Sequence, residues 1–133
     1  MTSSPLTLPL SPGMTHEMTF EVTPEYSAAH IGSGTAQVLS TPCMILFMER
    51  TAQRFLAQYL PEGYTSVGTL VNVRHLAATP VGETVRVRVE VLAVDGRRVT
   101  FAVEARDARQ KIGAGEHERF VVNEARFLQK VAG

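Results

Sequence analysis

Glu49 is the first residue that indicates chemistry, because it is a carboxylate on the apolar stripe of a predicted helix. It follows the apolar run 43–48 and falls four residues after Ile45 and seven before Leu56, which is the spacing of one helical face. An ionised carboxylate moved away from water is costly unless it is paired or hydrogen-bonded. Glu49 therefore either has a specific partner or lines a cavity, and both alternatives indicate a functional site.

His75 is the second candidate, because it alternates with Val71 and Val73 in a predicted strand. The two-residue period of a strand places its ring on the same face as these valines. One explanation is a core histidine with a satisfied hydrogen bond, and the other is a neutral imidazole that acts as a general base. Pairing with Glu49 would lessen the burial cost of both groups, so we interpret the two as neighbours.

Thr41 precedes Pro42 at the start of the same predicted helix, where it can serve as the N-cap. The free backbone N–H groups of a helix N-terminus can also hold an oxyanion. Eight residues separate Thr41 from Glu49, which is about 12 Å of helix rise. The two residues could therefore act together only on an extended substrate, or if a second subunit brings one of them in.

Other polar residues give weaker indications. His117 and Arg119 alternate with two glycines in the last predicted strand, where either a solvated face or a ligand contact would explain them. The sequence has no metal-binding spacing and only one cysteine, Cys43, and the Gly-Ser-Gly at 32–34 lacks the lysine that a phosphate-binding loop needs. We expect neither a metal nor another cofactor.

Composition limits the class of protein. The chain has 133 residues with 13 basic and 13 acidic side chains, so no overall field draws it to nucleic acid or anionic lipid. Its longest apolar run, 43–48, is far shorter than the roughly 20 residues of a membrane span, and residues 1–13 do not resemble a signal peptide. We predict a cytoplasmic protein with a flexible N-terminal arm, residues 1–14, and a single domain, residues 15–133.

The order of predicted elements indicates an α+β fold. A strand at 15–22 and a loop at 23–37 precede a helix at 42–60, and four strands follow in a meander: 68–79, 83–94, about 99–105, and 111–122. Asp95-Gly96 predicts the hairpin between the second and third of these. A five-stranded antiparallel sheet curved around one long central helix is the hotdog fold, although other α+β layouts share this order.

Several collinear blocks of the sequence resemble one family. They are Val-Leu-Ser-Thr-Pro at 38–42, Leu-Phe-Met-Glu at 46–49, Val-Gly-Thr at 67–69, the segment 73–82, and Gly-Ala-Gly-Glu-His-Glu-Arg at 113–119. With these blocks the chain resembles the fluoroacetyl-CoA thioesterase-like branch of the hotdog thioesterases. The resemblance covers residues 15 to 125 or so, and it implies hydrolysis of an acyl-CoA thioester.

The resemblance also implies roles for individual residues. The threonine, glutamate and histidine of thioester hydrolysis fall on Thr41, Glu49 and His75, and the glycine and arginine that contact substrate fall on Gly68 and Arg119. It further implies a homodimer with active sites at the subunit interface. The fluoroacetate-specific enzyme has phenylalanines in its lid, whereas residues 28–37 contain no aromatic side chain. The resemblance therefore implies a general acyl-CoA thioesterase and does not by itself extend fluoroacetyl specificity to this chain.

Two other functions are compatible with the same fold. A non-catalytic hotdog dimer could hold an acyl-CoA, with Glu49 and His75 as a structural or ligand-binding pair, and an enoyl-thioester hydratase would use similar acid–base groups. Whether the protein is a thioesterase or a hydratase, residues 26–37, here named the flap, would set acyl selectivity. Five arginines could bind the CoA phosphates, or could serve only for solubility and cross-strand pairing: Arg74, Arg86, Arg88, Arg97 and Arg98.

Overall fold

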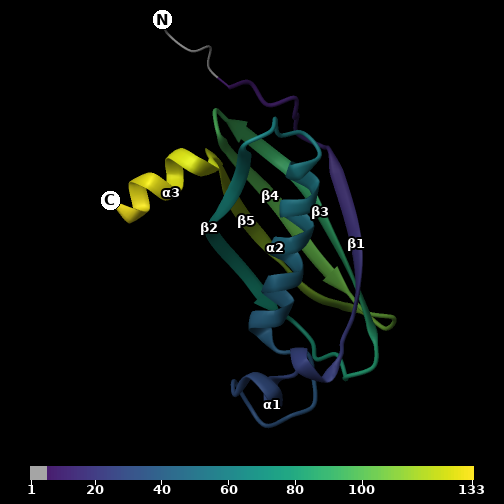
Figure 1. Ribbon diagram of the computed structural model, residues 1–133. Coiled ribbons are helices and arrows are strands. Elements are labelled where there is room, and N and C mark those ends of the chain that lie inside the picture. The colour runs from purple at the N-terminus through teal and green to yellow at the C-terminus, as the bar shows by residue number, and fades with distance from the viewer. Residues whose placement is uncertain (1–5) are drawn as a thin grey trace, which may run out of the picture.

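Strands and one long helix follow one another much as the sequence pattern predicts. The computed structural model describes residues 6–133 (Figure 1). Strand β1 (Thr15–Glu21) leads through two short helical segments, η1 (Pro24–Tyr26) and α1 (Ala28–Ile31), to the long helix α2 (Thr41–Ala57). The remaining elements are β2 (Tyr64–His75), β3 (Thr84–Asp95), β4 (Arg98–Arg106), β5 (Lys111–Asn123) and α3 (Glu124–Ala132).

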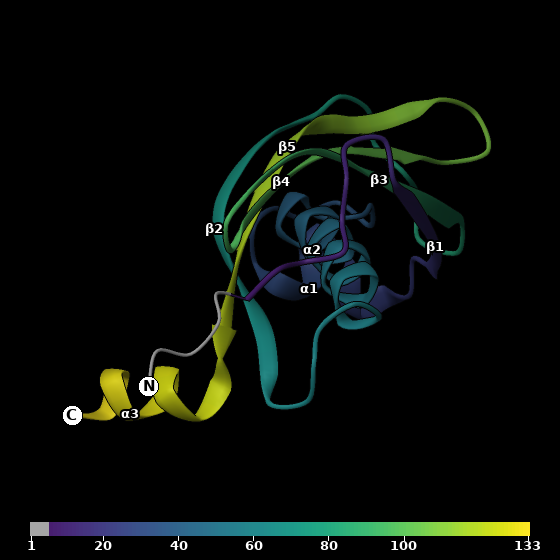
Figure 2. The ribbon, with the colours of Figure 1, turned by 90° about the horizontal axis from the view of Figure 1, so that it is seen from above.

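The strands form one antiparallel sheet in the order β1-β3-β4-β5-β2, so β1 and β2 are its two edges. Figure 2 shows the sheet curving around α2. The predicted α+β class, with a five-stranded antiparallel sheet wrapped around one long helix, is confirmed. The hairpin between β3 and β4 also turns at the predicted place, with φ of 62° at Gly96, which a glycine adopts without strain.

Alternating valines form the centre of the core. Val85, Val87, Val89 and Val91 of β3 are at most 1% exposed, as the alternation with charged residues predicts. They face the apolar side of α2, where Phe47 is fully buried. Phe47 stacks on Phe20 of β1, with ring centroids 4.4 Å apart. Burial of this stripe fixes α2 against the sheet and thereby sets where its polar residues lie.

Helix α2 begins at a different cap from the one predicted. The Ser40 hydroxyl accepts a hydrogen bond from the Cys43 N–H at 3.2 Å, so Ser40 is the N-cap and Thr41 is the first helical residue. The prediction that Thr41 caps the helix is therefore wrong. Both residues have a capping hydroxyl, but only Ser40 has the extended backbone of a cap, with ψ of 153°. The Thr41 hydroxyl is consequently available for another contact.

Strand β2 contains a bulge that changes which face its side chains point to. Its pairing with β5 shifts between Gly68 and Leu70. Gly68 lies opposite Arg119 and Val71 lies opposite His117, and both β5 residues point to the buried inner face. Even-numbered residues before the bulge and odd-numbered residues after it therefore share the inner face. This shift is what lets Gly68 and His75 face the same side.

Residues 6–14 and the C-terminal segment show structure that the sequence pattern did not predict. Residues 1–5 of the predicted flexible arm lie outside the described residues, but Leu8 is buried and Met14 packs against the core. The Gly13 N–H also donates to the Val91 carbonyl at 2.9 Å, so this part of the arm is bound to the sheet. Helix α3 was not predicted, although Phe127 and Val131 have helical spacing. Among the described residues, no helix has the length and apolarity needed to cross a membrane.

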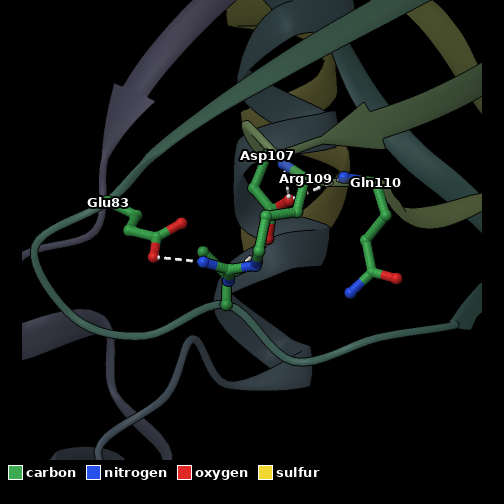
Figure 3. A network of polar contacts seen from close by, with 5 residues as sticks. Glu83, Asp107, Arg109 and Gln110 are labelled. Carbon is green, nitrogen blue, oxygen red and sulfur yellow. Dashed lines mark hydrogen bonds and ion pairs between the residues drawn. The ribbon is translucent and has the colours of Figure 1, made fainter.

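A carboxylate with a fully covered side chain, Asp107, ties the β4–β5 turn to the segment after β2. It accepts hydrogen bonds from the Thr79 hydroxyl at 2.9 Å and from the backbone N–H groups of Arg109 and Gln110 (Figure 3). Burial raises the pKa of Asp107, but these hydrogen bonds outweigh it and hold the pKa below its ordinary value. The Thr79 carbonyl in turn accepts from the Leu39 N–H at 2.8 Å. The network thus holds the start of α2 against the end of β2.

We predict that Asp107→Asn destabilises the fold by about 2 kcal/mol, because it weakens several hydrogen bonds to a covered charge. The matched control is Glu104→Gln, since Glu104 forms ion pairs with Arg106 and Lys111 at the surface. Such exposed pairs contribute roughly 0–1 kcal/mol. Urea unfolding at one fixed protein concentration measures both. A cost of Glu104→Gln equal to or above that of Asp107→Asn would contradict the role given to the network.

Candidate active site

Thr41 and His75 form the first of two polar clusters. The Thr41 hydroxyl oxygen lies 2.8 Å from Nδ1 of His75, which joins the first turn of α2 to the end of β2. The pair borders a hollow of about 330 Å³ lined by flap residues such as Ala28 and by residues 76–78. A hydroxyl within hydrogen-bond reach of an imidazole is the arrangement of a nucleophile and its general base.

The other ring nitrogen of His75 is unsatisfied. Nε2 is buried and has no hydrogen-bond partner within residues 6–133. Burial is the main reason that the pKa of His75 lies below the ordinary 6.5, and a hydrogen bond with the backbone of Ala77 opposes it. The ring is therefore neutral at neutral pH, with Nδ1 toward Thr41 and Nε2 without a hydrogen-bond partner among residues 6–133.

Glu49, Gly68 and Arg119 form the second cluster. The Arg119 Nη1 donates to Oε2 of Glu49 at 3.4 Å. A Cβ atom at position 68 would lie 2.5 Å from the same carboxylate oxygen, so a larger residue there would displace the Glu49 carboxylate from its present position. The Glu49 side chain keeps 38% of its surface exposed and borders a second, smaller hollow with Gln53. The cluster thus presents a carboxylate at the molecular surface.

Arg119 is held in place by two further residues. Its Nε donates to the Ser66 hydroxyl at 2.8 Å, and its Nη1 lies 3.2 Å from Nε2 of His117. Nδ1 of His117 lies 2.8 Å from the Leu70 carbonyl, which can only accept, so this nitrogen carries the proton and Nε2 accepts from Arg119. Burial lowers the pKa of His117, which agrees with a neutral ring. His117 therefore joins the arginine to the bulge of β2.

The structure does not bring the two clusters together within one chain. Thr41 contacts His75, whereas Glu49 pairs with Arg119 and lies against Gly68. Gly68 and His75 are seven residues apart on β2, which corresponds to about 23 Å of extended strand. The prediction that Glu49 and His75 are neighbours is therefore wrong for a single chain. The distance between Thr41 and Glu49 along α2 separates the same two clusters.

Sequence reasoning did not identify the residues that hold Arg119. The two-residue spacing of His117 from Arg119 indicates that both share a face, but it does not indicate that His117 holds the arginine. Ser66 has the same spacing from Gly68, but a lone serine in a strand gives no indication of a function. Its hydrogen bond to Arg119 spans 53 residues and depends on the pairing of β2 with β5.

The curved sheet around one helix defines a hotdog-fold protein, and a hydroxyl–imidazole pair at its edge strand is suited to acyl transfer. A model of the FlK family, described as fluoroacetyl-CoA-specific thioesterase, matches residues 22–125. The chain belongs to this family of hotdog thioesterases and is a thioester hydrolase.

Relatives of known function and structure agree with this assignment. The fluoroacetyl-CoA thioesterase of Streptantibioticus cattleyicolor is 43% identical over 95 residues, which are 71% of this chain and 68% of that protein. A solved structure of the fluoroacetyl-CoA thioesterase FlK is 36% identical with a TM-score of 0.88, covering 92% of this chain and 96% of the other. A hot-dog-like protein from Thermanaerovibrio acidaminovorans is 28% identical with a TM-score of 0.83, covering 90% and 89% of the two chains.

We predict that stability falls as the pH is lowered from 7.5 to 5.5, in part because of His117. Its pKa is lower in the folded protein than the 6.5 of a free histidine, so the unfolded chain takes up the proton first. This stability is fully present above pH 6.5 and is lost progressively below it. His117→Gln keeps one donor and one acceptor without titrating, and its melting temperature should fall less over this range. Equal falls for both proteins would contradict the role of His117.

Proposed function

We propose that this protein hydrolyses an acyl-CoA thioester to a carboxylic acid and free CoA, at sites shared between the two subunits of a homodimer. The observation that carries the proposal is the state of His75: Nδ1 contacts the Thr41 hydroxyl, while Nε2 is buried without a partner within residues 6–133. A buried nitrogen of this kind is costly unless something satisfies it. A carboxylate from a second subunit would do so.

The edge strand β2 supports the dimer. β2 pairs on one side only, with β5, and the large apolar residues Leu70 and Val71 are 45% and 42% exposed at its middle. Open sheet edges are templates for pairing with another chain, and homodimers commonly use a two-fold axis. Val71 and Asn72 lie midway between Gly68 and His75. Two antiparallel copies of β2 that meet at this midpoint place His75 opposite the partner's Gly68.

Such a dimer completes each site from two halves. Thr41 and His75 of one subunit would meet Glu49, Gly68 and Arg119 of the other. The Thr41 hydroxyl donates to Nδ1 of His75, and Nε2–H donates to the partner's Glu49, so that the carboxylate orients the base as in other hydroxyl–imidazole–carboxylate sites. The ion pair with Arg119 keeps the charge of Glu49 compensated before substrate arrives.

Hydrolysis then proceeds in two steps. His75 takes the proton of the Thr41 hydroxyl while its oxygen attacks the thioester carbonyl carbon. The carbon–sulfur bond breaks, and the CoA sulfur leaves with the proton that His75 returns. Water then attacks the carbonyl carbon of the threonine ester, again with His75 as the base. The bond between this carbon and the Thr41 oxygen breaks, His75 returns the proton to that oxygen, and the acid is released. Because the partner's Gly68 lacks a side chain, the partner's Glu49 carboxylate can lie against β2, where Nε2 of His75 reaches it in the proposed dimer.

The hollow next to Thr41 is the proposed acyl pocket. Its volume of about 330 Å³ and small lining side chains, such as Ala28, Val38 and Ala77, suit a short acyl group. Residues 28–37 supply no aromatic side chain to this hollow. We therefore propose that the flap selects the acyl group by its shape, and we do not extend fluoroacetyl specificity to this chain.

We predict that Glu49→Gln lowers kcat by about 10²–10⁴-fold, because the carboxylate that orients His75 and stabilises its protonated form is lost. Its effect on unfolding should stay within about 1 kcal/mol, because the Glu49 side chain is 38% exposed and a glutamine oxygen can still accept from the Arg119 Nη1. Release of free thiol from a panel of short, medium and aryl acyl-CoAs measures the activity, and Glu62→Gln in an exposed turn is the control. No turnover by wild type on any thioester, with tight acyl-CoA binding, would instead identify a binding module.

We also predict that two inactive variants restore activity when combined in one dimer. Thr41→Ala and Glu49→Gln should each inactivate both sites of their homodimers. A heterodimer carries one doubly altered site and one intact site, so it should have about half of wild-type activity, given two equivalent sites. Differently tagged subunits allow this heterodimer to be purified. An inactive heterodimer would show that each site lies within one chain.

A further inference from the structure

A groove on the outer face of the sheet lies outside the two polar clusters described so far. It has a volume of about 600 Å³ and separates α3 from the ends of β2 and β5. Figures 1 and 2 show α3 leaving the end of β5 and projecting beyond the β2 edge. Apolar side chains form most of the walls, namely Val67, Phe120, Val122, Phe127 and Val131.

Three cations surround this apolar groove. Arg97 comes from the β3–β4 turn, and Arg126 and Lys130 come from α3. No carboxylate lines the groove, and none of the three forms an ion pair with a residue in the range 6–133. The chain as a whole has a net charge of zero, so this group is a local excess of positive charge. Its field favours an anionic ligand.

We propose that the groove binds the 3′-phosphoadenosine diphosphate end of the CoA substrate. Arginine and lysine side chains are the usual partners of phosphate groups, and aromatic rings such as Phe120 and Phe127 can stack on a purine base. A ligand that is only apolar would leave the three cations unused, and a small inorganic anion would leave the apolar walls uncovered. This inference rests on the proposed acyl-CoA hydrolysis and adds the residues that recognise the nucleotide.

The position of the groove connects it to the thioester site. Val67 and Thr69 line the groove, and they flank Gly68 in β2. Gly68 faces inward, toward Glu49, so the nucleotide and the thioester lie on opposite faces of one strand. In the proposed dimer the partner's β2 ends at His75, opposite Gly68, which leaves the edge at residues 64–67 open. The pantetheine arm crosses the sheet edge there.

The experiment compares two thioesters of the same acyl group, one on CoA and one on N-acetylcysteamine, which lacks the nucleotide. The double variant Arg126→Gln/Lys130→Gln should raise KM for the acyl-CoA about tenfold or more, at unchanged kcat, and leave kcat/KM for the N-acetylcysteamine thioester unchanged. The control Arg54→Gln/Lys111→Gln removes the same charge from exposed positions outside the groove and should change neither. Equal losses on both substrates, or no loss on either, would overturn the proposal.

Two further measurements separate this proposal from its rivals. Calorimetry with adenosine 3′,5′-bisphosphate should show binding to wild type and at least tenfold weaker binding to the double variant. Nucleotide binding can be measured even if the wild-type protein hydrolyses neither thioester. Such a lack of hydrolysis would refute the proposed activity but not the proposed nucleotide site. Unchanged affinity for this nucleotide, or a smaller oligomer of the double variant on size-exclusion chromatography, would mean that α3 and the groove serve another purpose, such as a subunit contact.

Discussion

The bulge in β2 is the constraint on which both polar clusters depend. Gly68 and His75 are an odd number of residues apart, so a regular strand would point them to opposite faces of the sheet. The shift between Gly68 and Leu70 brings both to the face that covers α2. Side chains of β5 hold this irregular backbone, since His117 donates to the Leu70 carbonyl and Glu118 accepts from the Thr69 hydroxyl. Arg119, on the same strand, then reaches Glu49 across Gly68.

Much of the fold could be predicted because its signals are local. The valines of β3 alternate with charged residues, and the apolar stripe of α2 has helical spacing, so each element shows its buried face in its own sequence. The sequence also shows Glu49 and His75 as polar groups on apolar faces. It does not show which groups these two residues contact. Glu49 pairs with a residue 70 positions away, and a one-residue bulge decides which side chains of β2 it meets.

Other details escaped prediction for different physical reasons. Ser40 and Thr41 both offer a capping hydroxyl, and the choice between them depends on backbone torsions that the residue types do not encode. Helix α3 is short and is exposed along much of its length, so its apolar residues resemble a frayed strand end. Leu8 lies among prolines and serines, yet packs on a core that only the folded sheet provides. In each case the local structure depends on the folded backbone or on residues distant in the sequence, which the residue types alone do not specify.

The separation of the contacting residues along the chain has a consequence for folding. Thr41 and His75 are 34 residues apart, Leu70 and His117 are 47 apart, and Glu49 and Arg119 are 70 apart. Contacts of such high sequence separation form only after large loops have closed, which makes them late and cooperative events in folding. No isolated hairpin or helix of this chain can assemble either cluster. The protein can therefore be catalytically active only when the whole sheet has formed around α2. A partly folded chain can keep some secondary structure and still be inactive.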